Sequence, residues 1–260
     1  MENEYLIAFG TSGVFLFMMC FWIAIYLTAF PLFIKTDHKV TEIWRSLINI
    51  FVIELLAIDT WWRGQWCLIL DWSNHSGSVY HSPVFLLVIS NICAYNSVDF
   101  VHMSICWIKL FLNPDPKDSG GKKGPFLQGL YRYGPFIAHH LAVIAGTLMQ
   151  LATTRYFVLS MLGCLLEVTS ALYALRNMIK LKVVSFISLE TYDPYYKASF
   201  VIIRTFCVIL FLLHYQSDLP SGINTIYMIS TASLTFFSCG YMYLMWFGGS
   251  GKRSSVEKLF

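Results

Sequence analysis

The residues best able to do chemistry are ionisable side chains that lie inside long apolar stretches of the chain. Such groups are energetically expensive within a membrane-spanning helix, and they usually face a bundle interior or a functional cavity. An imidazole beside a carboxylate can move protons, and a guanidinium can bind a polar head group. The set consists of Glu54, Asp59, Asp99, His102, His139, His140, Glu167 and Arg204.

The adjacent histidines His139 and His140 are the most distinctive part of this set. We expect the apolar segments 134–152 and 155–178 to form a tight antiparallel hairpin. His140 would lie about thirteen residues before the turn and Glu167 about thirteen after it, which places them level. A carboxylate within hydrogen-bonding distance would fix the tautomer of that histidine. Successive helical residues point about 100° apart, so we expect one of the two histidines to face the polar site.

Three further groups are predicted to join this site. Asp99 and His102 are three residues apart, so they share one face of a helix. Arg204 lies about two turns into its apolar segment. Polar side chains in membrane bundles also serve as contacts between helices, which is the alternative interpretation of the same residues. Glu54 and Asp59 are expected to lie in the lumenal interface.

The elements that must position these groups are long apolar helices. Of the 260 residues, 57% are hydrophobic and 13% are charged, whereas soluble domains carry about 25% charged residues. A bilayer core of about 30 Å requires roughly 20 apolar residues in a helix. The sequence therefore predicts an all-α polytopic membrane protein, with about seven helices in a bundle or barrel around an interior cavity. The predicted spans are 12–34, 44–62, 83–112, 134–152, 155–178, 197–215 and 222–247.

The distribution of basic residues indicates the orientation. With seven spans, 14 of the 18 Lys and Arg residues fall on one side of the membrane. The other side holds Arg63 and Arg155, while Lys109 and Arg204 lie inside spans. Basic residues mark the cytosolic side of membrane proteins. The sequence therefore predicts a lumenal N-terminus and a cytosolic C-terminus.

Two features lie between the spans. Asn74 opens an Asn-His-Ser triplet, which is a glycosylation acceptor on the predicted lumenal side. Residues 113–124 are rich in Pro, Gly, Ser and Lys, and we expect them to form a flexible linker. No basic residue precedes the first span, so it is interpreted as a retained helix and not as a signal peptide.

Several kinds of chemistry have no motif in this sequence. Gly-rich phosphate loops, Gly-x-Ser-x-Gly, CxxC and HExxH patterns are all missing. Six of the seven cysteines lie in apolar segments, where we expect them to be small core residues. Cys67 alone lies in a loop, so no disulfide framework is available. We therefore expect no metal, no bound cofactor and no nucleic-acid partner.

Two stretches resemble the TLC domain, which is the membrane domain of ceramide synthases, of translocating-chain-associating proteins and of a group of smaller relatives. They are residues 136–151, FIAHHLAVIAGTLMQL, and residues 165–181, LLEVTSALYALRNMIKL. The stretch YNSVDFVH at residues 95–102 and the pair Trp44-Arg45 are similar to further elements of this family.

The resemblance implies a TLC-like six-helix membrane domain at residues 40–250. Residues 1–39 would then form an additional N-terminal transmembrane helix, and residues 251–260 a cytosolic tail. Ceramide synthases carry two acidic residues in the span after the histidine pair. Here Glu167 can stand for the first, but Ser170 replaces the second. The chain therefore looks more like the smaller relatives, which include an endoplasmic-reticulum cargo receptor and proteins that affect membrane lipid composition.

One function implied by the resemblance is acyl-CoA-dependent N-acyl transfer to a sphingoid or similar lipid amine. His139 or His140 would be the general base, and Glu167 would orient it. Acyl-CoA would be the co-substrate. The candidates for binding the lipid or substrate are Asp99, His102, Ser170 and Arg204.

The other function is lipid handling without catalysis, in sphingolipid, ceramide or phospholipid homeostasis of the endoplasmic reticulum. The same polar cluster would then hold a lipid head group. The missing second acid favours this hypothesis. The expected partners are membrane lipids, with a second copy of the chain or a cargo protein as a further partner.

A seven-helix signalling receptor would share the predicted orientation. However, the third span ends in CWIKLFLN, without an acidic-Arg-aromatic triplet. The last span ends in GYMYLMWF, without Asn-Pro-x-x-Tyr. The receptor class is therefore the weakest of the three hypotheses.

Overall fold

The computed structural model describes residues 2–32, 38–64, 83–112, 125–153 and 157–213, together with a few single residues between 225 and 240. The described residues form six helices and no strand, which confirms the all-α prediction. The helices are α1 (Glu2–Leu32), α2 (His38–Trp62), α3 (Pro83–Leu112), α4 (Pro125–Thr153), α5 (Phe157–Lys180) and α6 (Leu189–Leu213).

Each of the first six predicted spans corresponds to one helix. The span predicted at 134–152 lies within the longer helix α4, which begins at Pro125. The seventh predicted span, 222–247, lies mostly outside the described residues. Asn74, the linker 113–124 and the tail 251–260 also lie outside them.

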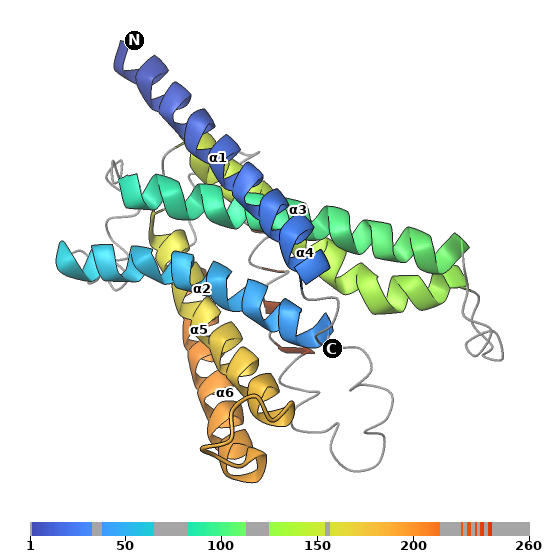
Figure 1. The fold of residues 1–260 in the computed structure, drawn as a ribbon. Coiled ribbons are helices and arrows are strands. Elements are labelled where there is room, and N and C mark those ends of the chain that lie inside the picture. The colour runs from blue at the N-terminus through green and yellow to red at the C-terminus, as the bar shows by residue number, and fades with distance from the viewer. Residues whose placement is uncertain are drawn as a thin grey trace.

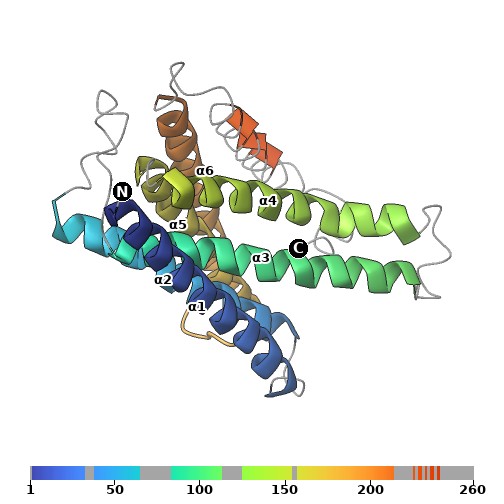
Figure 2. The same ribbon diagram turned by 90° about the horizontal axis from the view of Figure 1, so that it is seen from above.

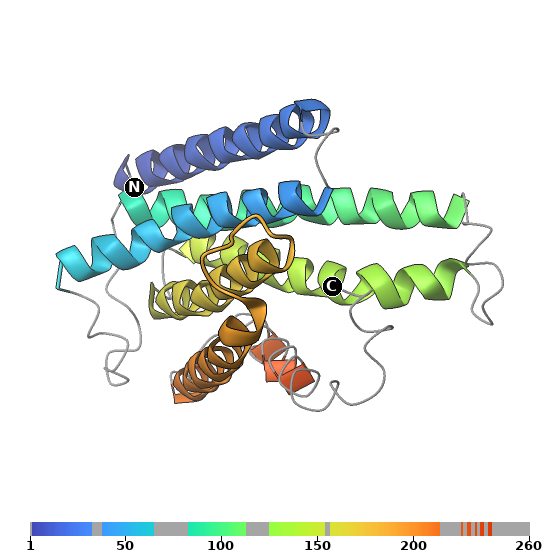
Figure 3. The same ribbon diagram turned by 60° about the horizontal axis from the view of Figure 1, so that its bottom comes forward.

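Helix α3 is the central element of the fold. It packs against α1, α2 and α4, whereas α5 packs against α2 and α6. The first four helices alternate in direction along the chain (Figures 1 and 2). The α5–α6 pair crosses this group instead of extending it (Figures 1 and 3). Contacts between α4 and α5 are few, so the hairpin predicted from their short connection does not form a closely packed pair.

A single stripe along α2 faces the rest of the protein. Its residues follow one another at intervals of three or four, which places them on one side of a helix. Several of them are polar, so α2 presents hydrogen-bonding groups to α1 and α3 and not only apolar surface. The buried members are Thr41, Arg45, Asn49, Ile53, Leu56 and Thr60.

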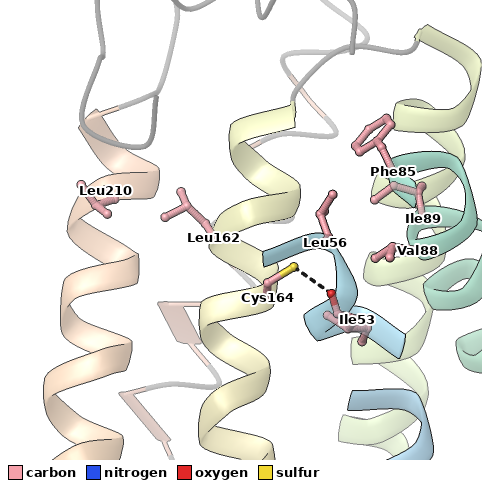
Figure 4. Close-up of a cluster of buried hydrophobic side chains, with 8 residues drawn as sticks. All are labelled: Ile53, Leu56, Phe85, Val88, Ile89, Leu162, Cys164 and Leu210. Carbon is pink, nitrogen blue, oxygen red and sulfur yellow. Dashed lines mark hydrogen bonds between the residues drawn. The ribbon is translucent and has the colours of Figure 1, made fainter. Parts of the chain in front are cut away.

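An apolar core joins α2, α3, α5 and α6 beyond this polar stretch (Figure 4). The Cys164 thiol lies 3.5 Å from the Ile53 carbonyl oxygen, to which it donates a hydrogen bond between α5 and α2. Cys93, Cys164 and Cys207 are buried, as predicted for small core residues, whereas Cys106 is half-buried and Cys20 and Cys239 are exposed, so the prediction is wrong for these three. The core side chains are Ile53, Leu56, Phe85, Val88, Ile89, Leu162, Cys164 and Leu210.

Among the described residues, α3 is the one helix that is both long enough and apolar enough to cross a membrane. A little over half of its apolar window, 56%, is buried inside the protein. The core helix of a soluble protein can meet the same two criteria of length and composition.

The connection between α5 and α6 begins with a left-handed residue. The Val183 N–H donates to the Met178 carbonyl at 2.9 Å, and the Lys182 N–H donates to the Ile179 carbonyl at 3.0 Å. These two hydrogen bonds form the Schellman pattern, in which the residue after the helix adopts a positive φ. Lys182 occupies that position with a φ of 58°. Glycine is the usual residue there because it has no Cβ to clash with the backbone.

We predict that Lys182→Gly raises the free energy of unfolding by about 1 kcal/mol, because it relieves the strain of a left-handed residue. Lys182→Ala is the matched control, since it removes the same charge but keeps the Cβ atom. Chemical unfolding of both variants in detergent micelles measures the difference. Equal stabilities of the two variants would contradict the assigned conformation.

An ionic cluster fastens the start of α6 to the end of α5. The Asp193 carboxylate lies 2.5 Å from Arg176 Nε and 2.8 Å from Lys197 Nζ. The Arg176 guanidinium also lies over the Tyr196 ring, 5.7 Å from its centroid. Burial alone would raise the pKa of Asp193, but the hydrogen bonds and positive charges of Lys197 and Arg176 outweigh it, so this pKa falls below its ordinary value.

This shift predicts how the joint responds to acid. Because the pKa of Asp193 is lower in the folded protein, the cluster stabilises the fold above the unfolded pKa of about 3.9. That contribution is lost as the pH falls below this value towards the folded pKa. We expect the melting temperatures of wild type and Asp193→Asn to differ at pH 7 and to approach each other as the pH falls below about 3.9. A difference that stays constant over this range would show that Asp193 is not ionised in the folded protein.

Candidate functional site

The centre of the site is a buried pair formed by Asp99 of α3 and His140 of α4. His140 Nε2 lies 2.9 Å from Asp99 Oδ2. Both residues are buried, with 7% of Asp99 and 6% of His140 exposed. The ring N–H at Nε2 is not aligned with a hydrogen-bond acceptor, so the contact is an ion pair more than a linear hydrogen bond. Since α3 and α4 pack along each other, this pair lies inside their interface.

Two neighbours determine where the protons of this pair lie. The Asn96 amide nitrogen donates to the Ile92 carbonyl at 2.7 Å, so its oxygen faces His140 Nδ1 at 2.5 Å. Nδ1 must therefore carry a proton, because an amide oxygen only accepts. The Tyr26 hydroxyl donates to the other Asp99 oxygen. A bare Nε2 facing a carboxylate would repel it, so the pair holds one proton besides that on Nδ1, and Asp99 and His140 together carry no net charge.

Arg45 of α2 completes the cluster on the side of α1. Its guanidinium carbon lies 4.1 Å from the centroid of the Tyr26 ring. Only 5% of Arg45 is exposed, yet Nε and Nη1 have no hydrogen-bond partner among the described residues. We refer to Tyr26, Arg45, Asn96, Asp99 and His140 together as the Asp99–His140 cluster. It draws residues from α1, α2, α3 and α4.

A chain of buried amides lies next to this cluster. The Trp22 indole N–H donates to Asn91 at 2.8 Å, and the Asn91 amide donates to Asn49 at 2.9 Å. These two hydrogen bonds connect α1, α3 and α2. They satisfy buried polar groups that would otherwise be costly, and they fix the rotation of the three helices that supply Tyr26, Asp99 and Arg45.

A second polar group lies on α2, α5 and α6. Glu167 is hydrogen-bonded to Ser170 and interacts electrostatically with the positive charge of Arg204. The Arg204 guanidinium donates to the Thr169 hydroxyl at 3.1 Å. Glu54 lies close enough to Glu167 for the two carboxylates to interact electrostatically, and its Oε1 is buried without a hydrogen-bond partner among the described residues.

The structure therefore redistributes the predicted site residues. Asp99 and His140 meet. Glu167 interacts with His140 through its charge, but the predicted hydrogen bond between them does not form, because α3 and not α5 is the close neighbour of α4. The His139 side chain is exposed, with its ring centroid 5.6 Å from that of His140. The His102 ring contacts the Tyr26 ring edge-to-face, with the two ring centroids 5.5 Å apart.

Sequence reasoning missed Tyr26, Arg45 and Asn96 as site residues. Two of them carried a usable signal. Asn96 precedes Asp99 by three residues and therefore shares its helix face. Arg45 belongs to the buried stripe of α2, whereas its place at the start of an apolar segment predicts a basic residue at the membrane surface. Tyr26 had no such signal, since it is one aromatic residue in an apolar span.

The cluster can bind and polarise a ligand, but both ring nitrogens of His140 already face other side chains. Nδ1 faces Asn96 and Nε2 faces Asp99, so neither points to a substrate position from which it could remove a proton. Among the described residues, no three His, Cys, Asp or Glu side chains are grouped so that they could hold a metal ion.

No family model, curated protein or solved structure matches the chain. The resemblance to the TLC domain is thus supported by the residues named above and by no independent match.

The Asp99–His140 pair gives a direct prediction for stability. Asp99→Asn removes one partner of a buried pair and should lower the free energy of unfolding by about 3 kcal/mol or more. Asp59→Asn is the matched control. It breaks an ion pair with the exposed Arg63 at 3.0 Å, which should cost no more than about 1 kcal/mol. Equal losses in the two variants, measured by denaturant unfolding in micelles, would contradict the pairing.

Proposed function

We propose that the chain is a multi-pass membrane protein that binds lipid within the group of helices α1–α4, without catalysing a reaction. The observation that carries this proposal is the Asp99–His140 cluster. It places ionisable groups between apolar helices, but it leaves neither nitrogen of its histidine available as a base. Buried polar clusters of this kind fix the orientation of a ligand whose remaining surface is apolar.

Seven spans, a lumenal N-terminus and a cytosolic C-terminus are part of the proposal. The split of basic residues between the two sides supports them. The alternating directions of α1–α4 are compatible with this arrangement, and α3 has the length and apolar character of a span. Large apolar side chains also remain exposed on α1, α3 and α6, as lipid-facing helices require. Examples are Leu27, Phe111 and Ile202.

The proposed class is a TLC-like protein of the endoplasmic reticulum, related in function to the smaller members of that family. Its histidine pair and the residues 165–181 support this assignment. The expected ligands are sphingolipids, ceramide or membrane phospholipids. A second copy of the chain or a cargo protein is the expected protein partner.

The alternative function is acyl-CoA-dependent N-acyl transfer. A lipid amine would attack the thioester carbonyl, forming the C–N bond as the C–S bond breaks. A histidine would take the proton from the nitrogen and return it to the leaving CoA thiolate. The exposed ring of His139 suits this role better than the buried ring of His140. His140 would then only hold its neighbouring side chains in position.

We predict that lipid co-purifies with the wild-type protein and is reduced at least severalfold in His140→Ala, because the cluster loses its central contact. Mass spectrometry of the purified full chain measures the bound lipid. His139→Ala is the matched control, since it removes the adjacent imidazole from an exposed position and should retain the lipid.

The same preparations distinguish the enzyme from the binding protein. Each is incubated with palmitoyl-CoA and a sphingoid amine, and amide formation is followed by mass spectrometry. We expect no turnover from any of them. Amide synthesis by the wild type that is abolished in His139→Ala would refute the binding function and establish the acyltransferase.

A further inference from the structure

The charge balance of the Asp99–His140 cluster is incomplete among the side chains that the structure describes. Asp99 and His140 share one proton, so the pair is neutral wherever that proton lies. The two oxygens of Asp99 are occupied by Tyr26 and His140. Glu167 interacts with His140 through its charge, and Asp99 with Arg45. Among the described residues, however, no carboxylate forms an ion pair with Arg45.

Part of the hydrogen-bonding capacity of Arg45 is also unused. A guanidinium carries five N–H donors in a planar fork. Nε and Nη1 are both buried and unpartnered among the described residues, while the stacked Tyr26 ring covers one face of the group. A buried cation without a partner is strongly unfavourable, so a ligand that supplies acceptor oxygens would stabilise this arrangement.

The position of Arg45 along α2 suggests which ligand that is. Arg45 is the second residue of the predicted span 44–62 and lies at its predicted cytosolic end. Basic pockets between helices on the cytosolic side of a membrane bind anionic head groups. The guanidinium fork matches the geometry of phosphate oxygens.

We propose that Arg45 forms a binding subsite for a phosphate group, lined by Tyr26 and the neutral Asp99–His140 pair. This rests on the lipid-binding function proposed above and narrows the ligand to a phosphate-bearing amphiphile. Either a phospholipid or the phosphates of acyl-CoA can supply that chemistry. The two sources are separated by the test.

The test uses the full chain in detergent micelles and three probes, with the midpoint of thermal unfolding as the readout. The probes are dioleoyl phosphatidate, palmitoyl-CoA and dioleoylglycerol, which has the acyl chains of phosphatidate but no phosphate. We expect phosphatidate to raise the midpoint of the wild type and dioleoylglycerol to have little effect. Arg45→Met should weaken phosphatidate binding about a hundredfold. Arg45→Lys should bind with intermediate affinity, because it keeps the charge but loses the fork.

Arg63→Gln is the matched control on the same helix, since it removes an exposed arginine and should bind like the wild type. Without any probe, Arg45→Met should unfold near the wild-type midpoint, because it removes an uncompensated charge. A severe loss of stability in that variant, or failure to fold, would show that Arg45 has a structural partner and would overturn the subsite.

The outcomes separate the two proposals. Equal binding of phosphatidate and dioleoylglycerol, both unchanged in Arg45→Met, would leave lipid binding intact and overturn the phosphate subsite. A response to palmitoyl-CoA alone that is lost in Arg45→Met would support the subsite and assign its phosphate to acyl-CoA. If none of the probes changes the midpoint and no lipid co-purifies, both the lipid-binding function and the subsite fall.

Discussion

The contact between the Asp99 carboxylate and the His140 imidazole constrains much of the rest of the structure. Two ionisable groups that are buried between packed helices must satisfy each other, because an unpaired buried charge is strongly unfavourable. The pair fixes the register of α3 against α4, and the Tyr26 hydroxyl ties α1 to the same carboxylate. Asn96 then holds the imidazole by its other nitrogen. Four polar side chains thus define the relative positions of three helices.

The same contact indicates that His140 positions other groups and does not act as a catalytic base. A general base needs a nitrogen that can reach the proton of its substrate, and the surroundings of His140 occupy both of its nitrogens. Among the described residues, two N–H groups of Arg45 have no acceptor, and a guanidinium donates and cannot accept. The chemistry of the cluster is therefore better suited to holding an anionic head group than to removing a proton. The second group around Glu167 and Arg204 lies towards α5 and α6, and contributes charge at longer range.

The helix α1 has a larger role than an additional N-terminal helix would need. Trp22 and Tyr26 lie one helical turn apart and reach two different polar contacts, one with Asn91 and one with Asp99. The aromatic rings also cover the cluster, with Tyr26 stacked against Arg45. A protein that lacked α1 would leave Asp99 and Arg45 more open to their surroundings. The predicted six-helix domain at 40–250 would thus lack part of the site.

The sequence by itself determined the all-α class and the course of six helices, because long apolar segments bounded by polar residues have few alternatives. It also identified Asp99 and His140, since ionisable residues are conspicuous in apolar surroundings. Only the tertiary structure decided that they pair with each other, that Glu167 belongs to a second group and that Arg45 is buried. Those outcomes depend on which helices pack together. Periodicity gives the face that each helix presents, but the partner of that face is chosen by side-chain packing over the whole fold.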